Sequence, residues 1–292
     1  ACGSSYHVGM VGKYNLEHLL RRNVEVALAS EFRYSDPIVD DKTLVIIISQ
    51  SGETSDTLAA LKLAKSRGVQ VLAINTLGVL YIVESGDTVH SVEDLRGKTI
   101  YASGKGNTPE AALNYVLTQN GIDPSADVTI EWKSEHAECV AALAEGAGAV
   151  AMLPQPFVVV ARSQVDGLRV ALDLTKEWNA LGGGSQLITA VLLVRSEFLE
   201  QHPQAVEKLL DEYTQSVDFL NDQPAEASVL VEKYGIVKAA VAEKAIPDCN
   251  IVCITGDNMK TMASGYLQVL YDQNPESVGG KLPGDDFYWM GK

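Results

Sequence analysis

Short apolar runs alternate with amphipathic stretches through the first two thirds of the chain. Strands are predicted where β-branched residues gather: 24–29, 44–49, 69–75, 99–102, 128–132, 149–153 and 188–194. Helices are predicted between them: 6–21, 56–67, 108–119, 136–144 and 155–163. The run 44–48 is apolar at every position, as in strands that are covered on both faces. The alternation predicts an α/β fold with parallel sheets wound with helices.

The pattern changes after Val194, where predicted helices follow one another without strands between them. These helices span 196–201, 203–221, 224–234, 237–245 and 258–272. Pro203 and Pro224 stand in first-turn positions, which proline favours. A helical tail of this kind lets a chain return to its first lobe and cover it. The pattern therefore predicts two α/β units followed by a helical segment that returns to cover the first.

The overall composition is that of a globular protein with an acidic surface. Of the 292 residues, 46% are hydrophobic and 21% are charged. The formal net charge of −15 would repel nucleic acids and anionic membranes, so neither is expected as a partner. No apolar run approaches the roughly 20 residues that cross a bilayer. The chain opens without a basic and apolar leader, so we expect an export signal to be absent or already removed.

Four cysteines, Cys2, Cys139, Cys249 and Cys253, lack the spacing of a zinc site. They are predicted to be free or buried thiols rather than a disulfide scaffold. Neither a metal nor a cofactor is expected.

Two serine-rich loops near the front each follow a predicted strand and open a helix. The candidate phosphate ligands in these loops are Ser4, Ser5, Ser49, Gln50, Ser51 and Thr54. In a parallel sheet, both loops would fall at the carboxyl edge, where ligands bind. Free N–H groups at helix N-termini and hydroxyl groups favour anions there. Helix capping explains either loop alone, but the pair of loops favours an anion site.

A third loop repeats this arrangement after the predicted strand 99–102. Its candidate ligand residues are Ser103, Lys105, Asn107 and Thr108. Capping of the helix by Asn107 or Thr108 explains this loop equally well. Gln155 stands between two prolines after the strand 149–153, and it is predicted to face a cleft between the two units.

Other chemistry-bearing residues are given structural roles. His136 is expected to cap a helix or to lie at the surface. Trp132 and Trp178 are expected to pack in the core rather than to line the cleft. Cys2 has no visible histidine–acid partner that would activate it. No catalytic residue is therefore predicted.

The segments 1–7 (ACGSSYH), 29–34 (ASEFRY) and 49–58 (SQSGETSDTL) carry a specific resemblance. Through them, residues 1–68 resemble the sugar isomerase (SIS) domain of glutamine–fructose-6-phosphate aminotransferase, the glucosamine-6-phosphate synthase. The resemblance implies that the loop 49–54 grips a sugar phosphate with help from Ser5, while Ser4 replaces the more usual threonine. The family's catalytic glutamate, histidine and lysine lie beyond this segment, and no matching motif follows. Isomerase activity is therefore not expected.

Different motifs follow from Val69 onward. The stretches 95–100 (LRGKTI), 104–110 (GKGNTPE) and 153–157 (LPQPF) resemble ABC-transporter solute-binding proteins of the nitrate/sulfonate/thiamine-precursor class. This resemblance implies a non-catalytic, two-lobed type II periplasmic-binding-protein fold that closes over a small solute. Many members carry an acid where this chain has Gln155, which leaves the identity of the solute open.

The two resemblances meet inside one predicted lobe. Residues 1–68 form the SIS-derived, flavodoxin-like first half of lobe one, 69–83 and 195–292 form the remainder of that lobe, and 84–194 form lobe two. The isomerase-like segment supplies the order of strands and helices with which a binding-protein lobe begins. The junction falls at a helix C-terminus beside Gly68, where no linker is needed. Two half-domains joined in this way suggest deliberate construction, because gene fusions usually keep whole domains.

The leading hypothesis is an engineered, non-catalytic chimera that keeps a loop pair for phosphate or a sugar phosphate at the interlobe cleft. The first alternative is a solute-binding protein for a small organic solute, and a sugar-phosphate isomerase is less favoured. A monomer is expected. The cellular location stays open, because the isomerase family is cytoplasmic, whereas the binding proteins are periplasmic or lipid-anchored outside the cell.

Overall fold

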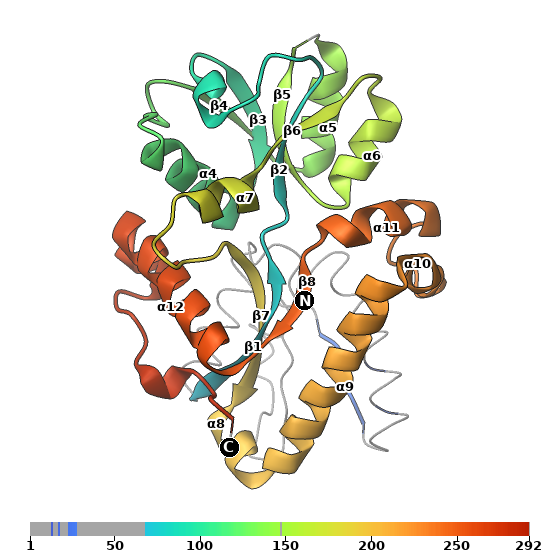
Figure 1. The fold of residues 1–292 in the computed structure, drawn as a ribbon, viewed down its shortest axis with the longest axis vertical. Coiled ribbons are helices and arrows are strands. Elements are labelled where there is room, and N and C mark those ends of the chain that lie inside the picture. The colour runs from blue at the N-terminus through green and yellow to red at the C-terminus, as the bar shows by residue number, and fades with distance from the viewer. Residues whose placement is uncertain (1–12, 14–16, 18–22, 28–67, 147, 292) are drawn as a thin grey trace.

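The computed structural model describes residues 13, 17, 23–27, 68–146 and 148–291 (Figure 1). Residues 13 and 17 are helical, within the helix predicted at 6–21, and Lys13 forms an ion pair of 3.7 Å with Glu17. Residues 23–27 lie in no helix or strand, so the strand predicted at 24–29 is wrong over its described part. The predicted elements 44–49 and 56–67 lie outside the described residues.

One lobe is built on a five-stranded sheet with the order β4-β3-β5-β2-β6. Its strands are β2 (Leu80–Glu84), β3 (Thr99–Ser103), β4 (Thr129–Lys133), β5 (Val150–Pro154) and β6 (Arg169–Asp173). β3 runs parallel to β4 and β5, which confirms the three strands predicted there. β2 and β6 lie outside the predicted strands. Because β2 runs antiparallel to β5 and β6, the sheet is mixed rather than parallel.

Among the described residues, the second lobe contains a three-stranded sheet with the order β7-β1-β8. Its strands are β1 (Val69–Leu77), β7 (Ile188–Arg195) and β8 (Ile251–Ile254). β1 pairs antiparallel with both neighbours, so the prediction of parallel strands is wrong for this part of the lobe. The strands predicted at 69–75 and 188–194 are confirmed, and β8 is an additional short strand.

Helices cover both faces of the five-stranded sheet. They are α4 (Thr108–Gln119), α5 (His136–Glu145), α6 (Phe157–Gln164) and α7 (Leu174–Ala180). The alternation of side chains along β2 shows how the two faces are filled. Ile82 packs with Leu113 of α4 and Trp178 of α7, whereas Tyr81 and Val83 belong to the cluster under α5 and α6.

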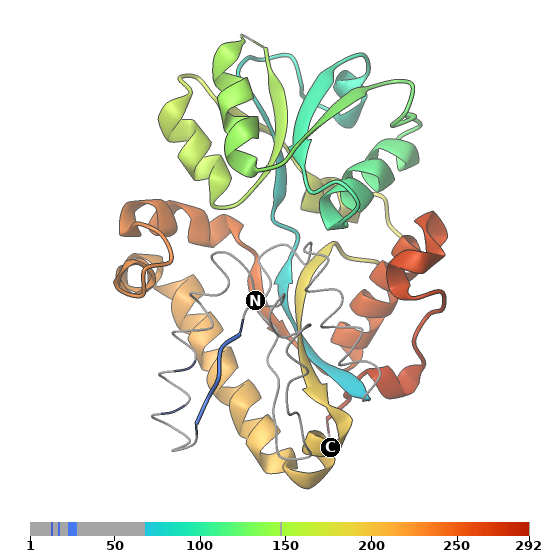
Figure 2. The same cartoon turned by 180° about the vertical axis from the view of Figure 1, so that it is seen from behind.

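The helical tail consists of α8 (Ser196–Gln201), α9 (Pro203–Asp222), α10 (Pro224–Lys233), α11 (Ala239–Ala245) and α12 (Gly256–Gln273). In this tail, α8, α9 and α12 lie against the three-stranded sheet, as predicted, whereas α10 and α11 lie to its side and α11 contacts α6 of the other lobe (Figures 1 and 2). Pro203 and Pro224 occupy first-turn positions of α9 and α10. No helix in the described part of the chain is long and apolar enough to cross a membrane.

From residue 68 onward, the chain passes between the lobes twice, between β1 and β2 and between α7 and β7. Two segments therefore lie in the other lobe from the one predicted. Residues 80–83 belong to the five-stranded sheet, and residues 188–194 belong to the three-stranded sheet. The assignment of residues 1–68 to the first lobe stays a prediction.

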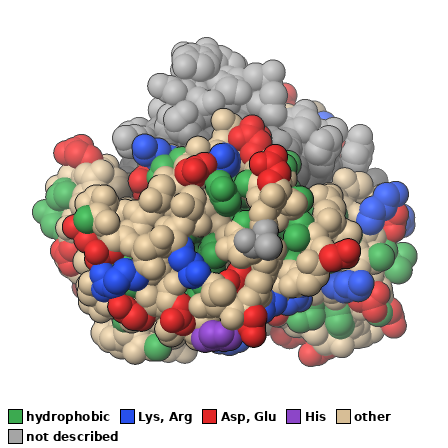
Figure 3. Space-filling view, turned by 90° about the horizontal axis from the view of Figure 1, so that it is seen from above, with side chains coloured by type: hydrophobic (Ala, Val, Ile, Leu, Met, Phe, Trp, Pro, Cys, Tyr) green, Lys and Arg blue, Asp and Glu red, His purple; other side chains and the backbone are tan. Residues whose placement is uncertain are grey.

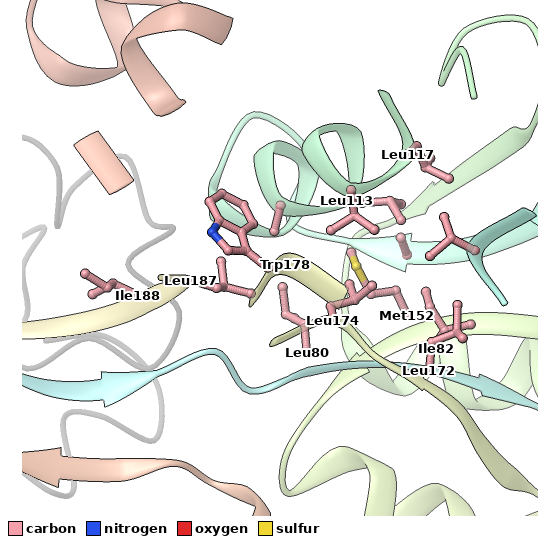
Figure 4. Close-up of a cluster of buried hydrophobic side chains, with 14 of the residues drawn as sticks. Leu80, Ile82, Leu113, Leu117, Met152, Leu172, Leu174, Trp178, Leu187 and Ile188 are labelled. Atoms are coloured by element: carbon pink, nitrogen blue, oxygen red, sulfur yellow. The ribbon is translucent and has the colours of Figure 1, made fainter. Parts of the chain in front are cut away.

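A single apolar cluster continues from one lobe into the other on the side of α4, α7 and α12. Leu80, Leu113, Leu174 and Trp178 continue into Leu187 and Ile188 in Figure 4. The same cluster includes Met259, Ala263 and Tyr266 of α12. Because protein cores are close-packed, this shared cluster joins the two lobes firmly along this side.

The surface at the outer end of the five-stranded lobe carries charges of both signs. Figure 3 shows acidic and basic side chains interspersed there, without a large area of one sign. The negative net charge is thus not concentrated on this face.

Candidate functional site

The carboxyl ends of β3, β4 and β5 meet at one edge of the five-stranded sheet. They do so because β3 lies between β4 and β5 and runs parallel to both. The segment after each strand leads to a helix whose N-terminus lies near this edge. The main chain of Gln155, just after β5, extends the pairing with β2, because its N donates to the carbonyl oxygen of Val79 at 3.1 Å. The Gln155 side chain reaches Asp248, which precedes β8 of the other sheet. The edge therefore faces the other lobe, and in α/β sheets it is the edge that binds ligands.

The segment 103–108 begins at Ser103, the last residue of β3, and leads into α4. Ser103 is buried, whereas Lys105 is exposed and Asn107 and Thr108 are half-buried. Gly104 and Gly106 both have φ of +84°, a conformation that glycine adopts at little cost. Asn107 is the N-cap residue of α4, but its side chain makes no capping bond. Instead, its Nδ2 donates to the carbonyl oxygen of Lys105 at 3.3 Å, so capping by the Asn107 side chain does not explain the loop.

Ser103 pairs with a residue that the sequence does not mark. Its Oγ lies 2.6 Å from Nδ1 of His136, the first residue of α5. The imidazole ring also packs against Phe157, with ring centroids 4.7 Å apart. Burial lowers the pKa of His136, against an opposing effect of nearby Glu135. The expectation of a capping or surface role for His136 is therefore wrong.

The side chain of Gln155 is buried at the lobe junction with one polar atom unsatisfied. The residue is 7% exposed. Its Nε2 donates to Oδ2 of Asp248 at 3.4 Å, whereas its Oε1 has no hydrogen-bond partner. A buried carbonyl oxygen without a partner costs about 1–3 kcal/mol. Turning the amide over would bring Oε1 against the Asp248 carboxylate, so the observed orientation is the favourable one.

Asp248 is a second residue that the sequence does not mark as part of a site. It ends the short 3-10 helix Ile246–Asp248, which precedes β8 in the other lobe. Its carbonyl oxygen accepts a hydrogen bond of 2.7 Å from the hydroxyl of Tyr81 in β2. Tyr81 and Gln155, on neighbouring strands of one lobe, thus both contact Asp248 of the other.

The potential around Tyr81 is negative. Burial raises the pKa of the Tyr81 hydroxyl, and the nearby Asp173 and Asp248 carboxylates raise it further. Burial also raises the pKa of Glu177, with a further contribution from Asp173. Lys176 pairs with Asp173 at 3.2 Å, but its side chain extends into solvent. The phenol therefore remains a hydrogen-bond donor at neutral pH.

The two tryptophans considered above have structural surroundings. Trp178 is fully buried, and its Nε1 donates to Ser185 Oγ at 3.0 Å. Its ring packs between Tyr115 and Tyr266, with centroids 4.2 Å and 5.7 Å away. Trp132 is partly buried against the same core cluster. The prediction of core packing is confirmed for Trp178, whereas Trp132 packs against the core and stays partly exposed.

The front loops lie outside the described residues. These include the candidate phosphate ligands Ser4, Ser5, Ser49, Gln50, Ser51 and Thr54, so their convergence on one site stays a prediction. Cys2 also lies there. Cys139, Cys249 and Cys253 are free thiols, and Cys139 is buried. Among the described residues, no group of three or more histidine, cysteine, aspartate or glutamate side chains is placed to hold a metal ion.

Known structures share the two-lobed architecture over nearly the whole chain. The aliphatic sulphonate binding protein SsuA of Escherichia coli superposes with a TM-score of 0.70 at 17% identity, over 99% of this chain and 90% of that one. An ABC transporter protein from Parabacteroides distasonis gives 0.66 at 21% identity, over 93% and 88%. The SsuA of Xanthomonas axonopodis pv. citri, bound to MOPS, gives 0.60 at 16%, over 92% and 89%. The fold is that of a two-lobed solute-binding protein.

Sequence comparison identifies the family of the chain and a second family match in the front segment. The NMT1/THI5-like family model matches residues 55–227, more than half of the chain, and the chain belongs to this family. The SIS domain model matches residues 1–88. The resemblance of the chain to both families is thus confirmed. The two matches overlap at residues 55–88, and the predicted junction near residue 68 falls within the overlap.

The front segment is similar to curated glutamine–fructose-6-phosphate aminotransferases. Glutamine–fructose-6-phosphate aminotransferase of Clostridium tetani is 54% identical over 92 residues, 31% of this chain and 15% of that protein. The enzyme of Mycobacterium leprae is 41% identical over 165 residues, 54% of this chain and 26% of that protein. The chain therefore spans about a sixth to a quarter of these enzymes.

Proposed function

We propose that the protein binds a small organic solute between its two lobes and does not transform it. One observation carries this proposal: the segments after β3 and β5 meet at the sheet edge that faces the other lobe, where Gln155 is buried against Asp248. The residues assigned to the solute are Ser103, Lys105, Asn107, Thr108 and Gln155. The binding-protein fold supports a non-catalytic role.

The proposed solute contacts come from a glycine-containing loop and from the side-chain amide of Gln155. Gly104 and Gly106 let the main chain of the 103–108 loop come close to a ligand, because they lack a Cβ. Gln155 is held by its main-chain bond to Val79 and by Asp248. A solute that satisfies Oε1 of Gln155 would remove the unsatisfied polar group that the protein alone contains.

Titration calorimetry tests this proposal with a panel of small sulfonates, carboxylates, phosphates, amines and heterocycles. Sulfonates belong in the panel because two similar structures are sulfonate-binding proteins by name. Gln155→Leu should weaken any solute that binds the wild type by about tenfold, through loss of a buried hydrogen bond. Gln164→Leu, an exposed glutamine at the end of α6, is the matched control. Equal affinity in all three proteins would contradict the assignment.

A second candidate is binding of phosphate or a sugar phosphate by the front segment. The 54% identity to an aminotransferase over 92 residues supports it, together with the loops that hold Ser5 and Ser51. Glucosamine-6-phosphate should then release or absorb heat at millimolar concentration, and Ser51→Ala should abolish the signal. The absence of heat in the wild type would reject retained binding. Turnover of fructose-6-phosphate would instead support an isomerase.

We also propose that the chain has an engineered origin. It is supported by two family matches that overlap at residues 55–88, and by a sequence that has no linker between them. Finding the whole chain as one natural open reading frame would contradict deliberate construction. It would leave the proposed solute binding unaffected.

A further inference from the structure

The contacts of Gln155 and Asp248 limit the chemistry of the solute. Oε1 of Gln155 is a buried acceptor without a partner, and the neighbouring Asp248 carboxylate also accepts. No positively charged side chain pairs with Asp248 among the residues that the structure describes. The Gln155 amide thus links its own unpaired acceptor to the exposed carboxylate of Asp248, and a group with several N–H bonds can donate to both acceptors.

The charges near this point also favour a cation. The carboxylates of Asp173 and Asp248 contribute to the raised pKa of Tyr81, and Asp173 also contributes to the raised pKa of Glu177. Lys176 is bonded to Asp173 and is 83% exposed at its side chain, and the other cation of the proposed site, Lys105, is exposed as well. An anion placed against Gln155 would be repelled by these carboxylates, whereas a cation would be attracted.

We infer that Gln155 and Asp248 together form a subsite for a protonated nitrogen group of the solute, such as an ammonium or amidinium. This inference rests on the proposed function and names the chemical class of one end of the solute. Oε1 of Gln155 and the Asp248 carboxylate accept from this group, one from each lobe. The solute thereby bridges the lobes at this point, and Asp248 becomes a binding residue of the site.

Tyr81 positions Asp248, the residue that the lobe with the three-stranded sheet contributes to this subsite. Its hydroxyl donates to the carbonyl oxygen of Asp248 at 2.7 Å and thus fixes the main chain that carries the carboxylate. Tyr81 is itself 5% exposed and packed in the cluster under α5 and α6. Its phenol therefore holds Asp248 in place without needing to touch the solute.

The test is a thermal-shift and calorimetric screen with paired compounds. Each pair shares one anionic or neutral skeleton and differs by an amino group: ethanesulfonate and 2-aminoethanesulfonate, propylphosphonate and 3-aminopropylphosphonate, toluene and benzylamine. The inference predicts that the amino member of a pair binds at least about tenfold more tightly to the wild type. Asp248→Asn keeps the shape and removes the charge, so it should reduce that preference about tenfold.

The control is Asp166→Asn, which removes the same charge from an exposed residue after α6 and should leave the preference intact. Unfolding temperatures of all variants show whether each one is folded. Equal or tighter binding of the members without an amino group overturns the inference but leaves solute binding standing. The same holds if amines bind and Asp248→Asn has no effect. No response to any compound overturns both the subsite and the proposed function.

Discussion

Ser103 Oγ and His136 Nδ1 lie 2.6 Å apart and join the end of β3 to the start of α5. When the imidazole is neutral with Nδ1 unprotonated, the hydroxyl of Ser103 donates to it; when Nδ1 carries a proton, the ring donates to Ser103. The protonation of His136 therefore decides whether Ser103 keeps a proton to offer a solute. A residue next to the proposed site thus controls its hydrogen bonding.

The burial of His136 predicts a pH dependence of stability. Its pKa is lowered from 6.5 in the folded protein, so the unfolded chain binds the proton more readily. The free energy of unfolding should therefore fall as the pH drops below about 6.5, until the folded-state pKa is passed. Urea unfolding from pH 8 to pH 5 measures this loss. His136→Gln should flatten that part of the curve, and His90→Gln, at an exposed ring, should not. Identical curves for wild type and His136→Gln would refute the prediction.

The crossing between β1 and β2 allows only a glycine at residue 78. A Cβ there would lie 2.7 Å and 2.9 Å from Leu187 side-chain atoms and would collide with Thr175 Oγ1. Gly78→Ala should therefore lower the free energy of unfolding by about 1–3 kcal/mol. Gly146→Ala is the control, because no atom lies within 4 Å of its Cβ position and its φ is −147°. Chemical unfolding compares them, and similar stabilities for both variants would contradict the packing described here.

Replacing Trp178 with alanine should lower the free energy of unfolding more than Gly78→Ala does. It is fully buried between Tyr115 and Tyr266, and it belongs to the cluster that spans both lobes. Trp178→Ala should cost about 3–5 kcal/mol, the range for large aromatic residues in cores. Trp132→Ala, at a partly buried position of the same cluster, should cost less. Urea unfolding followed by circular dichroism gives both values; an equal cost would argue against a central role for Trp178.

Buried thiols predict slow alkylation of the folded chain. Burial raises the pKa of Cys139 to about 11 and that of Cys249 to about 11. Because the thiolate is the reactive form, both should react slowly with iodoacetamide at pH 8 and quickly in urea. Peptide mass spectrometry assigns the rate to each cysteine. Cys139 should be the slower of the two, since it is fully buried and Cys249 is partly exposed. Equal rates in buffer and in urea at Cys139 would contradict its burial.

The sequence predicts best where local signals agree. The helix 108–119 is predicted with the bounds that α4 has, because Asn107 precedes it, Pro109 lies in its first turn and its apolar residues recur with helical spacing. The apolar pattern around residues 69–84 does not show that β1 ends at Leu77 and that β2 crosses to the other sheet. Strand direction is also hidden, since it depends on pairing between distant segments.

The site is predictable only in part, for the same physical reason. Ser103 and Gln155 follow strands and are marked by glycine and proline, so their positions at the sheet edge can be inferred. His136, Tyr81 and Asp248 come from other elements, and tertiary packing alone brings them to Ser103 and Gln155. Two acceptors held together across the lobes leave no pattern in the sequence.

The central claim is that a solute lies between the lobes at Gln155. A crystal structure of the protein grown with the tightest-binding compound of the panel tests it most directly. The account predicts density for the compound within hydrogen-bonding distance of Gln155 Oε1, flanked by Ser103 from the loop after β3. Density for that compound only elsewhere on the molecule, with Gln155 Oε1 still unpaired, would contradict it.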